Sequence, residues 1–119
     1  NKSKRQHQEM QSLHQALEKA KLPTNIVVDC SHANSSKDHN VQPLVLDDIA
    51  HQIKDENRSI CGVMIESNIN EGNQSIPEDL SQLKYGVSVT DACISWESTV
   101  KSLNKMVSTL SGHLAGRRG

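Results

Sequence analysis

The sequence predicts an α/β fold with two parallel strands, in the order helix, strand, helix, strand, long loop, helix. Two short apolar runs, at about residues 26–31 and 60–66, lack the strict alternation of half-exposed strands. Such runs are typical of parallel strands that are covered on both faces. A helical repeat of apolar residues lies between them, and strand, helix and strand at this spacing predict a right-handed βαβ unit.

The first predicted helix covers about residues 4–21 and ends before Pro23, which cannot continue a helix. Its apolar residues recur at spacings of three and four, as expected of an amphipathic helix. They are Met10, Leu13, Leu17 and Ala20.

The second predicted helix covers about residues 43–54, and Pro43 suits its first turn. Its expected buried stripe is Val45, Ile49, Ala50 and Ile53. Residues 67–94 are rich in Asn, Gly and Ser and predict a loop, and a loop of this length is usually functional or disordered.

The last predicted helix covers about residues 95–114, and Ser95 is expected to cap its amino terminus. Apolar residues recur through it at helical spacing. They are Trp96, Val100, Leu103, Val107, Leu110 and Leu114.

The composition indicates a chain that does not build a complete core by itself. It has 119 residues, enough for at most one domain, and only 34% of them are apolar. Tyr85 and Trp96 are the only aromatic residues, which is few for an independent globular core. Two strands are also too few for a complete sheet. Together with a start at Asn1 rather than Met, these features predict a segment of a larger protein.

Charge and hydropathy exclude several classes of partner. The formal net charge is −1, so the chain has no basic field that would attract nucleic acid or an anionic membrane. No apolar stretch approaches the roughly 20 residues of a membrane span, and no signal-peptide pattern is present. These observations predict a soluble, cytoplasmic protein that binds neither nucleic acid nor membrane.

The cysteines do not predict a disulfide framework. There are three, an odd number, with no CxxC spacing. Cys30 and Cys61 each lie inside an apolar run, so we expect both to be small buried side chains. Cys93 follows Asp91 by two residues and lies close to a candidate site.

Three side chains with metal-binding chemistry lie where apolar sequence gives way to polar sequence: His32, Glu66 and Asp91. The carboxyl ends of parallel strands are where α/β folds hold ligands and metals. Strand alternation predicts that His32 and Glu66 converge if the faces that carry them are the inner ones, and the long loop would add Asp91. The two expected faces are Ile26, Val28, Cys30 and His32 on one strand, and Gly62, Met64 and Glu66 on the other.

One imidazole and two carboxylates suit Mn²⁺, Fe²⁺, Co²⁺ or Zn²⁺ better than Ca²⁺, which prefers oxygen ligands throughout. Each residue also has a simpler interpretation. Taken singly, His32 is more simply a hydrogen-bonded loop residue, Glu66 an ordinary strand-end carboxylate, and Asp91 a cap of a turn or helix. A metal hydrolase is a weaker alternative, because no residue is left to act as general base.

Other catalytic classes have less support. The sequence contains no nucleophile elbow, no phosphate-binding loop and no dinucleotide fingerprint. Ser31 and His32 are neighbours on a strand and should point to opposite faces, which excludes a Ser-His dyad. The other histidines have no partner spacing and are expected at the surface; they are His7, His14, His39, His51 and His113.

Four segments resemble the carboxyl-terminal third of the type I 3-deoxy-D-arabino-heptulosonate 7-phosphate (DAHP) synthases. The similarity runs from the first helix to near the end of the chain, and its motifs are long. They are Asp29–Lys37 (DCSHANSSK), Gly62–Asn68 (GVMIESN), Glu71–Gln74 (EGNQ) and Tyr85–Glu97 (YGVSVTDACISWE).

The resemblance implies a (β/α)8 barrel of about 250 residues, to which this chain would supply the last two strands. Such enzymes are transferases that condense phosphoenolpyruvate with erythrose 4-phosphate, the first step of the shikimate pathway to aromatic amino acids. The resemblance assigns His32, Glu66 and Asp91 as ligands of a divalent metal ion, with a fourth ligand, a Cys, outside this chain. The ion would act as a Lewis acid on the sugar aldehyde.

The resemblance also implies a complete enzyme that is homo-oligomeric and inhibited by an aromatic amino acid, with the tyrosine-sensitive kind favoured. The isolated chain lacks one ligand and the phosphate-binding residues, so we expect it to have no synthase activity. Cys93 is a candidate redox-sensitive thiol. The alternative interpretation is a non-catalytic metal-binding or structural α/β module derived from the barrel.

Overall fold

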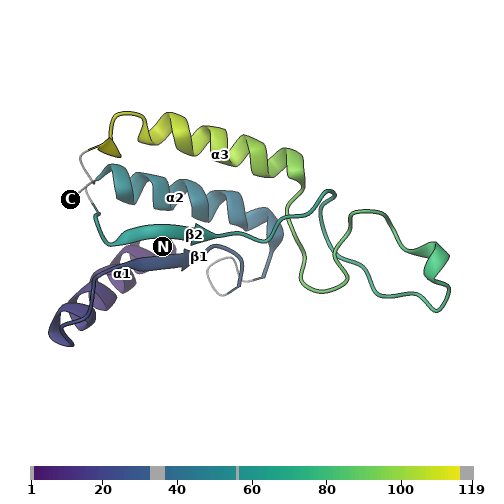
Figure 1. Ribbon diagram of the computed structural model, residues 1–119, viewed down its shortest axis with the longest axis horizontal. Coiled ribbons are helices and arrows are strands. Elements are labelled where there is room, and N and C mark those ends of the chain that lie inside the picture. Colours follow the sequence, from purple (N-terminus) through teal and green to yellow (C-terminus); the bar gives the residue numbers. More distant parts are fainter. Residues whose placement is uncertain (1, 33–36, 56, 116–119) are drawn as a thin grey trace.

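The computed structural model describes residues 2–32, 37–55 and 57–115, with side chains from residue 8 onward. Its elements follow the predicted order (Figure 1): α1 (Lys2–Lys19), β1 (Ile26–Asp29), η2 (His39–Val41), α2 (Gln42–Lys54), β2 (Ile60–Met64), η3 (Leu80–Gln82) and α3 (Trp96–Leu110). The two η elements are short 3-10 helices. Among the described helices, none is long and apolar enough to cross a membrane.

The strands β1 and β2 pair in parallel, as predicted, but both are shorter than their apolar runs. The register pairs Ile26 with Ile60, and the next residue, Val27, pairs with Gly62. Cys61 is therefore the extra residue of a bulge, and the structure leaves it exposed. The prediction of a buried Cys61 was wrong, because sequence alone does not show that the register shifts there. Cys30, by contrast, is completely buried.

Helices cover only one face of this small sheet. Ile26, Val28 and Cys30 pack in one cluster with Met10 of α1 and with the apolar stripe of α2, which includes Val45, Leu46 and Ile49. On the opposite face Val27 lies over Gly62 and is 63% exposed. Coverage on both faces, which the continuous apolar runs predicted, is therefore not achieved by the residues that the structure describes.

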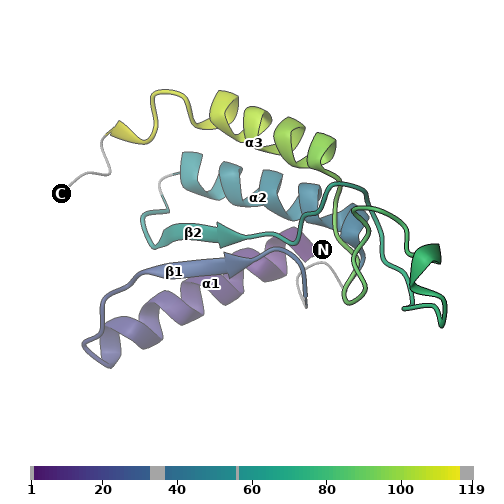
Figure 2. The ribbon, with the colours of Figure 1, turned by 45° about the vertical axis from the view of Figure 1, so that its right-hand side comes forward.

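The helix α3 lies alongside α2 on the side away from α1 (Figure 2). Ser95 caps it as predicted, since its side chain accepts a hydrogen bond from the Ser98 N–H at 3.1 Å. Met106 packs against the core and Lys105 forms an ion pair with Asp47 of α2 at 3.4 Å. The helix ends at Leu110, before the predicted residue 114.

Most apolar side chains of α3 are not buried in this chain. Trp96 is 63% exposed and Val107 is 68% exposed, and Val100 and Leu103 are also exposed. The helical repeat thus marks a second apolar face, turned away from α2, in addition to the face that holds Thr99 and Leu110.

Between β2 and α3 the chain forms a long arm that extends past the carboxyl ends of the strands (Figure 1). Isolated bridges hold its base together, pairing Ser67 with Ile94 and Gly72 with Cys93. Further out, the Gln74 side chain donates to the carbonyl of Lys84 at 2.9 Å and accepts from the Lys84 N–H at 2.9 Å. The arm is a hydrogen-bonded structure that returns the chain to the strand ends.

Candidate metal centre

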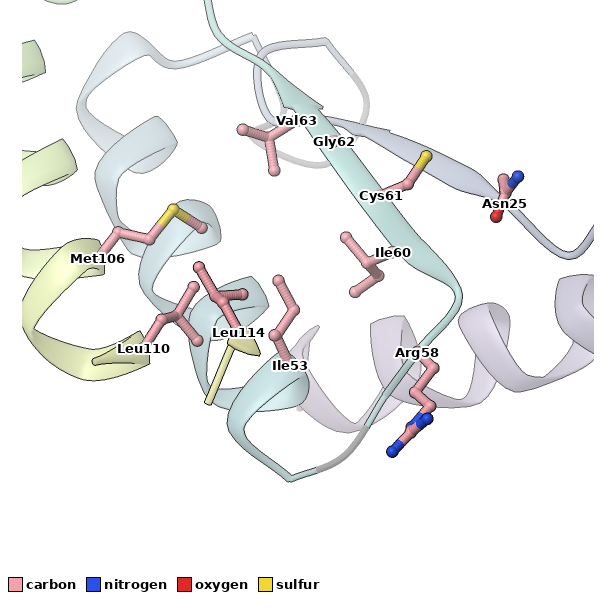
Figure 3. Close-up of a pocket in the computed structure, with 10 residues that line it drawn as sticks. All are labelled: Asn25, Ile53, Arg58, Ile60, Cys61, Gly62, Val63, Met106, Leu110 and Leu114. Atoms are coloured by element: carbon pink, nitrogen blue, oxygen red, sulfur yellow. The ribbon is translucent and has the colours of Figure 1, made fainter. Parts of the chain in front are cut away.

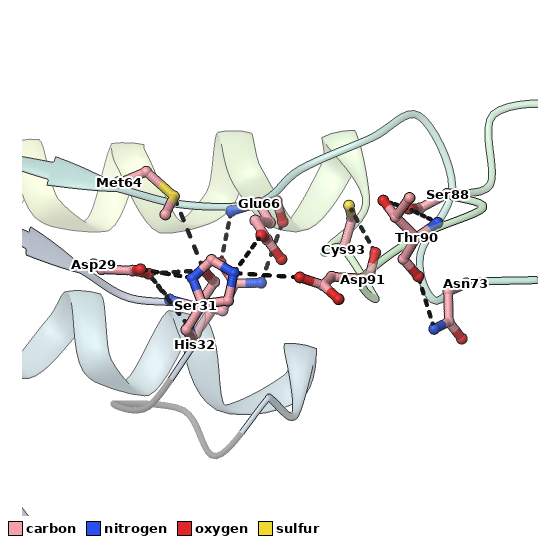
Figure 4. A network of polar contacts seen from close by, with 11 residues as sticks. Asp29, Ser31, His32, Met64, Glu66, Asn73, Ser88, Thr90, Asp91 and Cys93 are labelled. Atoms are coloured by element: carbon pink, nitrogen blue, oxygen red, sulfur yellow. Dashed lines mark hydrogen bonds and ion pairs between the residues drawn. The ribbon is translucent and has the colours of Figure 1, made fainter.

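The structure brings the three predicted side chains together at the carboxyl ends of the strands (Figure 4). His32 Nε2 lies 3.2 Å from Glu66 Oε1 and 3.2 Å from Asp91 Oδ2. One ligand atom of each residue lies within 4.8 Å of the other two. All three side chains are accessible from solvent.

His32 reaches this position by a turn and not by strand alternation. The strand β1 ends at Asp29, whose Oδ1 accepts hydrogen bonds from the backbone N–H groups of Ser31, at 2.8 Å, and of His32, at 3.3 Å. An Asp side chain that binds the backbone ahead of it redirects the chain. The expected inner face of Ile26, Val28 and Cys30 was wrong, because these residues pack against the helices.

The same turn corrects the prediction for Ser31. Its Oγ lies 3.1 Å from His32 Nδ1, so the two side chains are adjacent and do not point to opposite faces. The Ser31 hydroxyl donates to Asp29 Oδ1 at 2.7 Å. Its proton is therefore directed at the carboxylate, and the arrangement is a structural turn rather than a nucleophile and its base.

Glu66 is held by Gln42, a residue that the sequence analysis did not identify. Gln42 is 1% exposed, and its side-chain amide binds both the backbone N–H and the backbone carbonyl of Glu66. Its Oε1 accepts from the Glu66 N–H at 2.9 Å, and its Nε2 donates to the Glu66 carbonyl at 3.2 Å. No sequence pattern distinguishes a Gln at the start of a helix that is buried in this way from one that faces solvent.

Asp91 is placed by the base of the arm. Gly72 and Cys93 exchange backbone hydrogen bonds of 2.9 and 3.1 Å, and the Ile94 N–H donates to the Glu66 carbonyl at 3.0 Å. The Asn73 side chain donates to the Thr90 carbonyl at 3.0 Å. These bonds join the segment around Asp91 directly to the end of β2.

The charges around His32 favour its protonated form and an ionised Asp29. The hydrogen bond and charge of Asp29, with smaller contributions from Glu66 and Asp91, raise the pKa of His32. Partial burial acts to raise the pKa of Asp29, but hydrogen bonds from His32 and Ser31 outweigh it and hold that pKa well below its usual range. A site with this concentration of negative charge favours a cation between its ligands.

Cys93 lies beside this site, and burial together with the charges of Glu66 and Asp91 raises the pKa of its thiol. The thiolate is the reactive form of cysteine, so this environment does not activate it. Redox sensitivity of Cys93 therefore gains no support from the structure.

A pocket of about 180 Å³ opens over the three side chains, and Lys37, His39 and Asn73 also line it. His39 pairs with Glu71 of the arm at 3.4 Å. The expectation that the remaining histidines have no partners was therefore wrong for His39. It was also wrong for His14, which hydrogen-bonds to Ser59 and lies 3.0 Å from Glu18, although the His14 side chain is 37% exposed, as expected of a surface residue.

His51 also has a partner within α2, because its Nδ1 donates a hydrogen bond to the Asp47 carbonyl at 2.8 Å. His51 is 57% exposed at its side chain, and His113 is exposed. The side chain of His7 lies outside the described residues.

The donor set and its spacing fit a transition-metal ion. Ion-to-donor distances of about 2.0–2.2 Å place two donors of one ion roughly 3 Å apart. Both separations from His32 Nε2 have this size. One imidazole and two carboxylates leave at least one coordination position open, as catalytic sites require.

Comparison with known proteins identifies the family of the chain. The family model described as the DAHP synthetase I family matches residues 1–104. The chain belongs to this family. All three candidate ligands lie within the matched residues.

Curated relatives share the sequence over most of this chain. The Tyr-sensitive phospho-2-dehydro-3-deoxyheptonate aldolase of Salmonella typhimurium is 57% identical over 101 residues, which are 85% of this chain and 28% of that protein. The phenylalanine-inhibited aldolase of Saccharomyces cerevisiae is 52% identical over 100 residues, 79% of this chain and 27% of that protein. The chain therefore spans little more than a quarter of their length.

A solved structure of the same kind also matches. The phospho-2-dehydro-3-deoxyheptonate aldolase from Francisella tularensis superposes with a TM-score of 0.73 at 48% identity. The match covers 87% of this chain and 28% of that one. The arrangement of α1, the two strands, α2 and α3 is thus similar to part of a DAHP synthase.

Proposed function

We propose that this chain is the metal-binding end of a DAHP synthase, the transferase that condenses phosphoenolpyruvate with erythrose 4-phosphate. The observation that carries the proposal is the convergence of His32, Glu66 and Asp91 at the strand ends of a family member. Catalysis requires the remaining part of the barrel, so the isolated chain binds a metal ion weakly and does not turn over substrate.

Within that enzyme, the chain forms the last two βα units of the (β/α)8 barrel. In such a barrel one face of each strand points inward and helices cover the other. The exposed Val27 face of the sheet suits the interior of a barrel, and the cluster around Ile49 suits its outer layer.

The open edge of β2 supports the same placement. A pocket of about 570 Å³ lies between this edge and α3. Figure 3 shows the side chains of Ile53, Met106 and Leu110 directed toward Ile60 and Val63 of the strand. A neighbouring strand and its helix would fill this space and would cover the exposed apolar residues of α3.

The chain's own residues have distinct roles in the proposed site. His32, Glu66 and Asp91 hold the divalent ion, and a bound ion supplies Lewis acidity toward the aldehyde oxygen of the sugar phosphate. Gln42 fixes the backbone at Glu66, and the arm keeps Asp91 over the strand ends. The pocket beside them is also lined by His39 and by Lys37, a cation that suits anionic substrates.

The test is a chimera in which this chain replaces the matching 101 residues of the Salmonella typhimurium enzyme. We expect the chimera to form DAHP, to lose activity with a chelator and to recover it with Mn²⁺. His32→Ala should lower kcat at least about 100-fold, since Lewis-acid stabilisation is worth several kcal/mol. His113→Ala is the matched control and should leave kcat unchanged, because His113 is exposed.

Two results would contradict the proposal. One is a chimera whose activity survives both the chelator and His32→Ala. The other is turnover of both substrates by the 119-residue chain alone.

Feedback inhibition of the complete protein by an aromatic amino acid is part of the proposal. It is supported by relatives that are named Tyr-sensitive or phenylalanine-inhibited. We also propose that the complete protein is a homo-oligomer. Tyrosine titration and size-exclusion chromatography of the chimera test these two statements.

A further inference from the structure

Asp29 is not among the candidate ligands, yet its carboxylate touches the ring of His32 on the side away from them. Asp29 Oδ2 lies 2.6 Å from His32 Nδ1, while His32 Nε2 faces Glu66 and Asp91 (Figure 4). We propose that Asp29 is a positioning residue that fixes the proton of His32 on Nδ1 and so presents the Nε2 lone pair to the metal ion. This inference rests on the proposed metal site.

The carboxylate of Asp29 determines which ring nitrogen of His32 carries the proton. An ionised carboxylate can only accept hydrogen bonds. The contact with Asp29 Oδ2 therefore requires His32 Nδ1 to be the donor. In a neutral imidazole the other nitrogen, Nε2, then has a free lone pair, which is the form that binds a metal.

The turn at the end of β1 fixes the orientation of the carboxylate. Its Oδ1 accepts from the Ser31 N–H at 2.8 Å, the Ser31 hydroxyl at 2.7 Å and the His32 N–H at 3.3 Å. These donors bind Oδ1, and the imidazole of His32 binds Oδ2. The Asp29 side chain therefore both turns the backbone after β1 and sets the orientation of the His32 ring.

This geometry makes Asp29→Asn a selective test. The asparagine Oδ1 must stay toward the backbone N–H groups of Ser31 and His32, because an NH₂ group there would meet two donors. The NH₂ group then replaces Oδ2 and donates to His32 Nδ1, which moves the ring proton to Nε2. The turn is preserved, but His32 Nε2, which faces Glu66 and Asp91, now carries the ring proton and cannot bind the ion.

We expect Asp29→Asn to weaken Mn²⁺ binding, measured by calorimetry on the 119-residue chain, by about 10- to 100-fold. The circular dichroism spectrum should not change. Asp79→Asn is the matched control, because Asp79 makes a similar turn in the arm, away from the metal site: its Oδ1 accepts from the Ser81 N–H at 3.0 Å and from the Ser81 hydroxyl at 2.7 Å. This substitution should change the Mn²⁺ affinity less than about 3-fold.

The position of the proton is read directly from the ¹⁵N chemical shifts of the imidazole ring of His32, at the alkaline end of a pH titration, where the shifts no longer change and the ring is neutral. The unmodified chain should show the proton on Nδ1, and Asp29→Asn should show it on Nε2. A ring that carries its proton on Nε2 in the unmodified chain would overturn the inference, as would equal Mn²⁺ affinity of the unmodified and Asp29→Asn chains. Absence of Mn²⁺ binding by the unmodified chain would count against the proposed metal site, and the ring shifts would still decide the role of Asp29.

Discussion

Gln42 offers a sharp test of how the end of β2 is held. Its buried amide makes two hydrogen bonds to the Glu66 backbone, of 2.9 and 3.2 Å. In Gln42→Met the side chain keeps its length and loses both bonds. We expect this substitution to destabilise the chain and to release the strand end that carries Glu66.

The expected loss of stability depends on whether each backbone group of Glu66 keeps another hydrogen-bond partner. The Glu66 N–H has its hydrogen bond with Gln42, and burying it without a partner costs about 1–3 kcal/mol. The Glu66 carbonyl still accepts from the Ile94 N–H at 3.0 Å, so its loss is only about 0.5–1.5 kcal/mol. Methionine gains some apolar burial, which offsets part of this, and the free energy of unfolding should fall by about 2 kcal/mol.

A second buried glutamine in the same helix supplies the control. Gln52 is 4% exposed, and its Nε2 donates to Asp48 Oδ2 at 3.1 Å within α2. Its Oε1 has no hydrogen-bond partner among the described residues. Gln52→Met removes this unsatisfied oxygen along with one bond within the helix, so the free energy of unfolding should change by less than about 0.5 kcal/mol.

Urea unfolding followed by circular dichroism at 222 nm compares the two variants. With a slope of about 1–2 kcal/mol per molar urea, Gln42→Met should lower the midpoint by about 1–2 M and Gln52→Met should leave it nearly unchanged. Equal midpoints for the two variants would refute the assigned role of Gln42, because both remove a buried amide from α2.

Two further substitutions, one labelling experiment and one titration test the arm and the core. Gly86, at φ +70°, has no room for a Cβ, which would lie 2.7 Å from the Cβ of Ile69, whereas Gly72, at φ +88°, has open space. Gly72→Ala should cost about 1 kcal/mol of backbone strain, and Gly86→Ala should cost clearly more. The hydrogen-exchange rates of the arm amides measure both costs, and equal rates in the two variants would contradict the close contact between Gly86 and Ile69. Cys61 should react quickly with a thiol-reactive disulfide reagent and Cys30 only after unfolding, so rapid labelling of Cys30 would be incompatible with its burial. Burial raises the pKa of the Cys30 thiol from 9.0 to about 12, so its contribution to stability is complete below pH 9.0 and is lost as the pH rises toward 12; urea midpoints that stay constant above pH 9.0 would contradict this.

Local patterns in the sequence predicted the elements and the chemistry of the site. Apolar spacing located α1 and α2, and Ser95 located the start of α3, because these features depend on neighbours within a few residues. The site was predicted from three residues of suitable chemistry at strand ends. Its geometry was predicted for the wrong reason, since alternation along β1 does not extend past Asp29.

The sequence by itself determined which residue types stand at the ends of the two strands, and its motifs determined the family. The tertiary structure decided how those residues are held. The buried Gln42 amide binds a segment far along the chain, and the bulge that exposes Cys61 depends on strand register. A single sequence carries no signal for such bonds, because their energy arises only when the segments meet and exclude water.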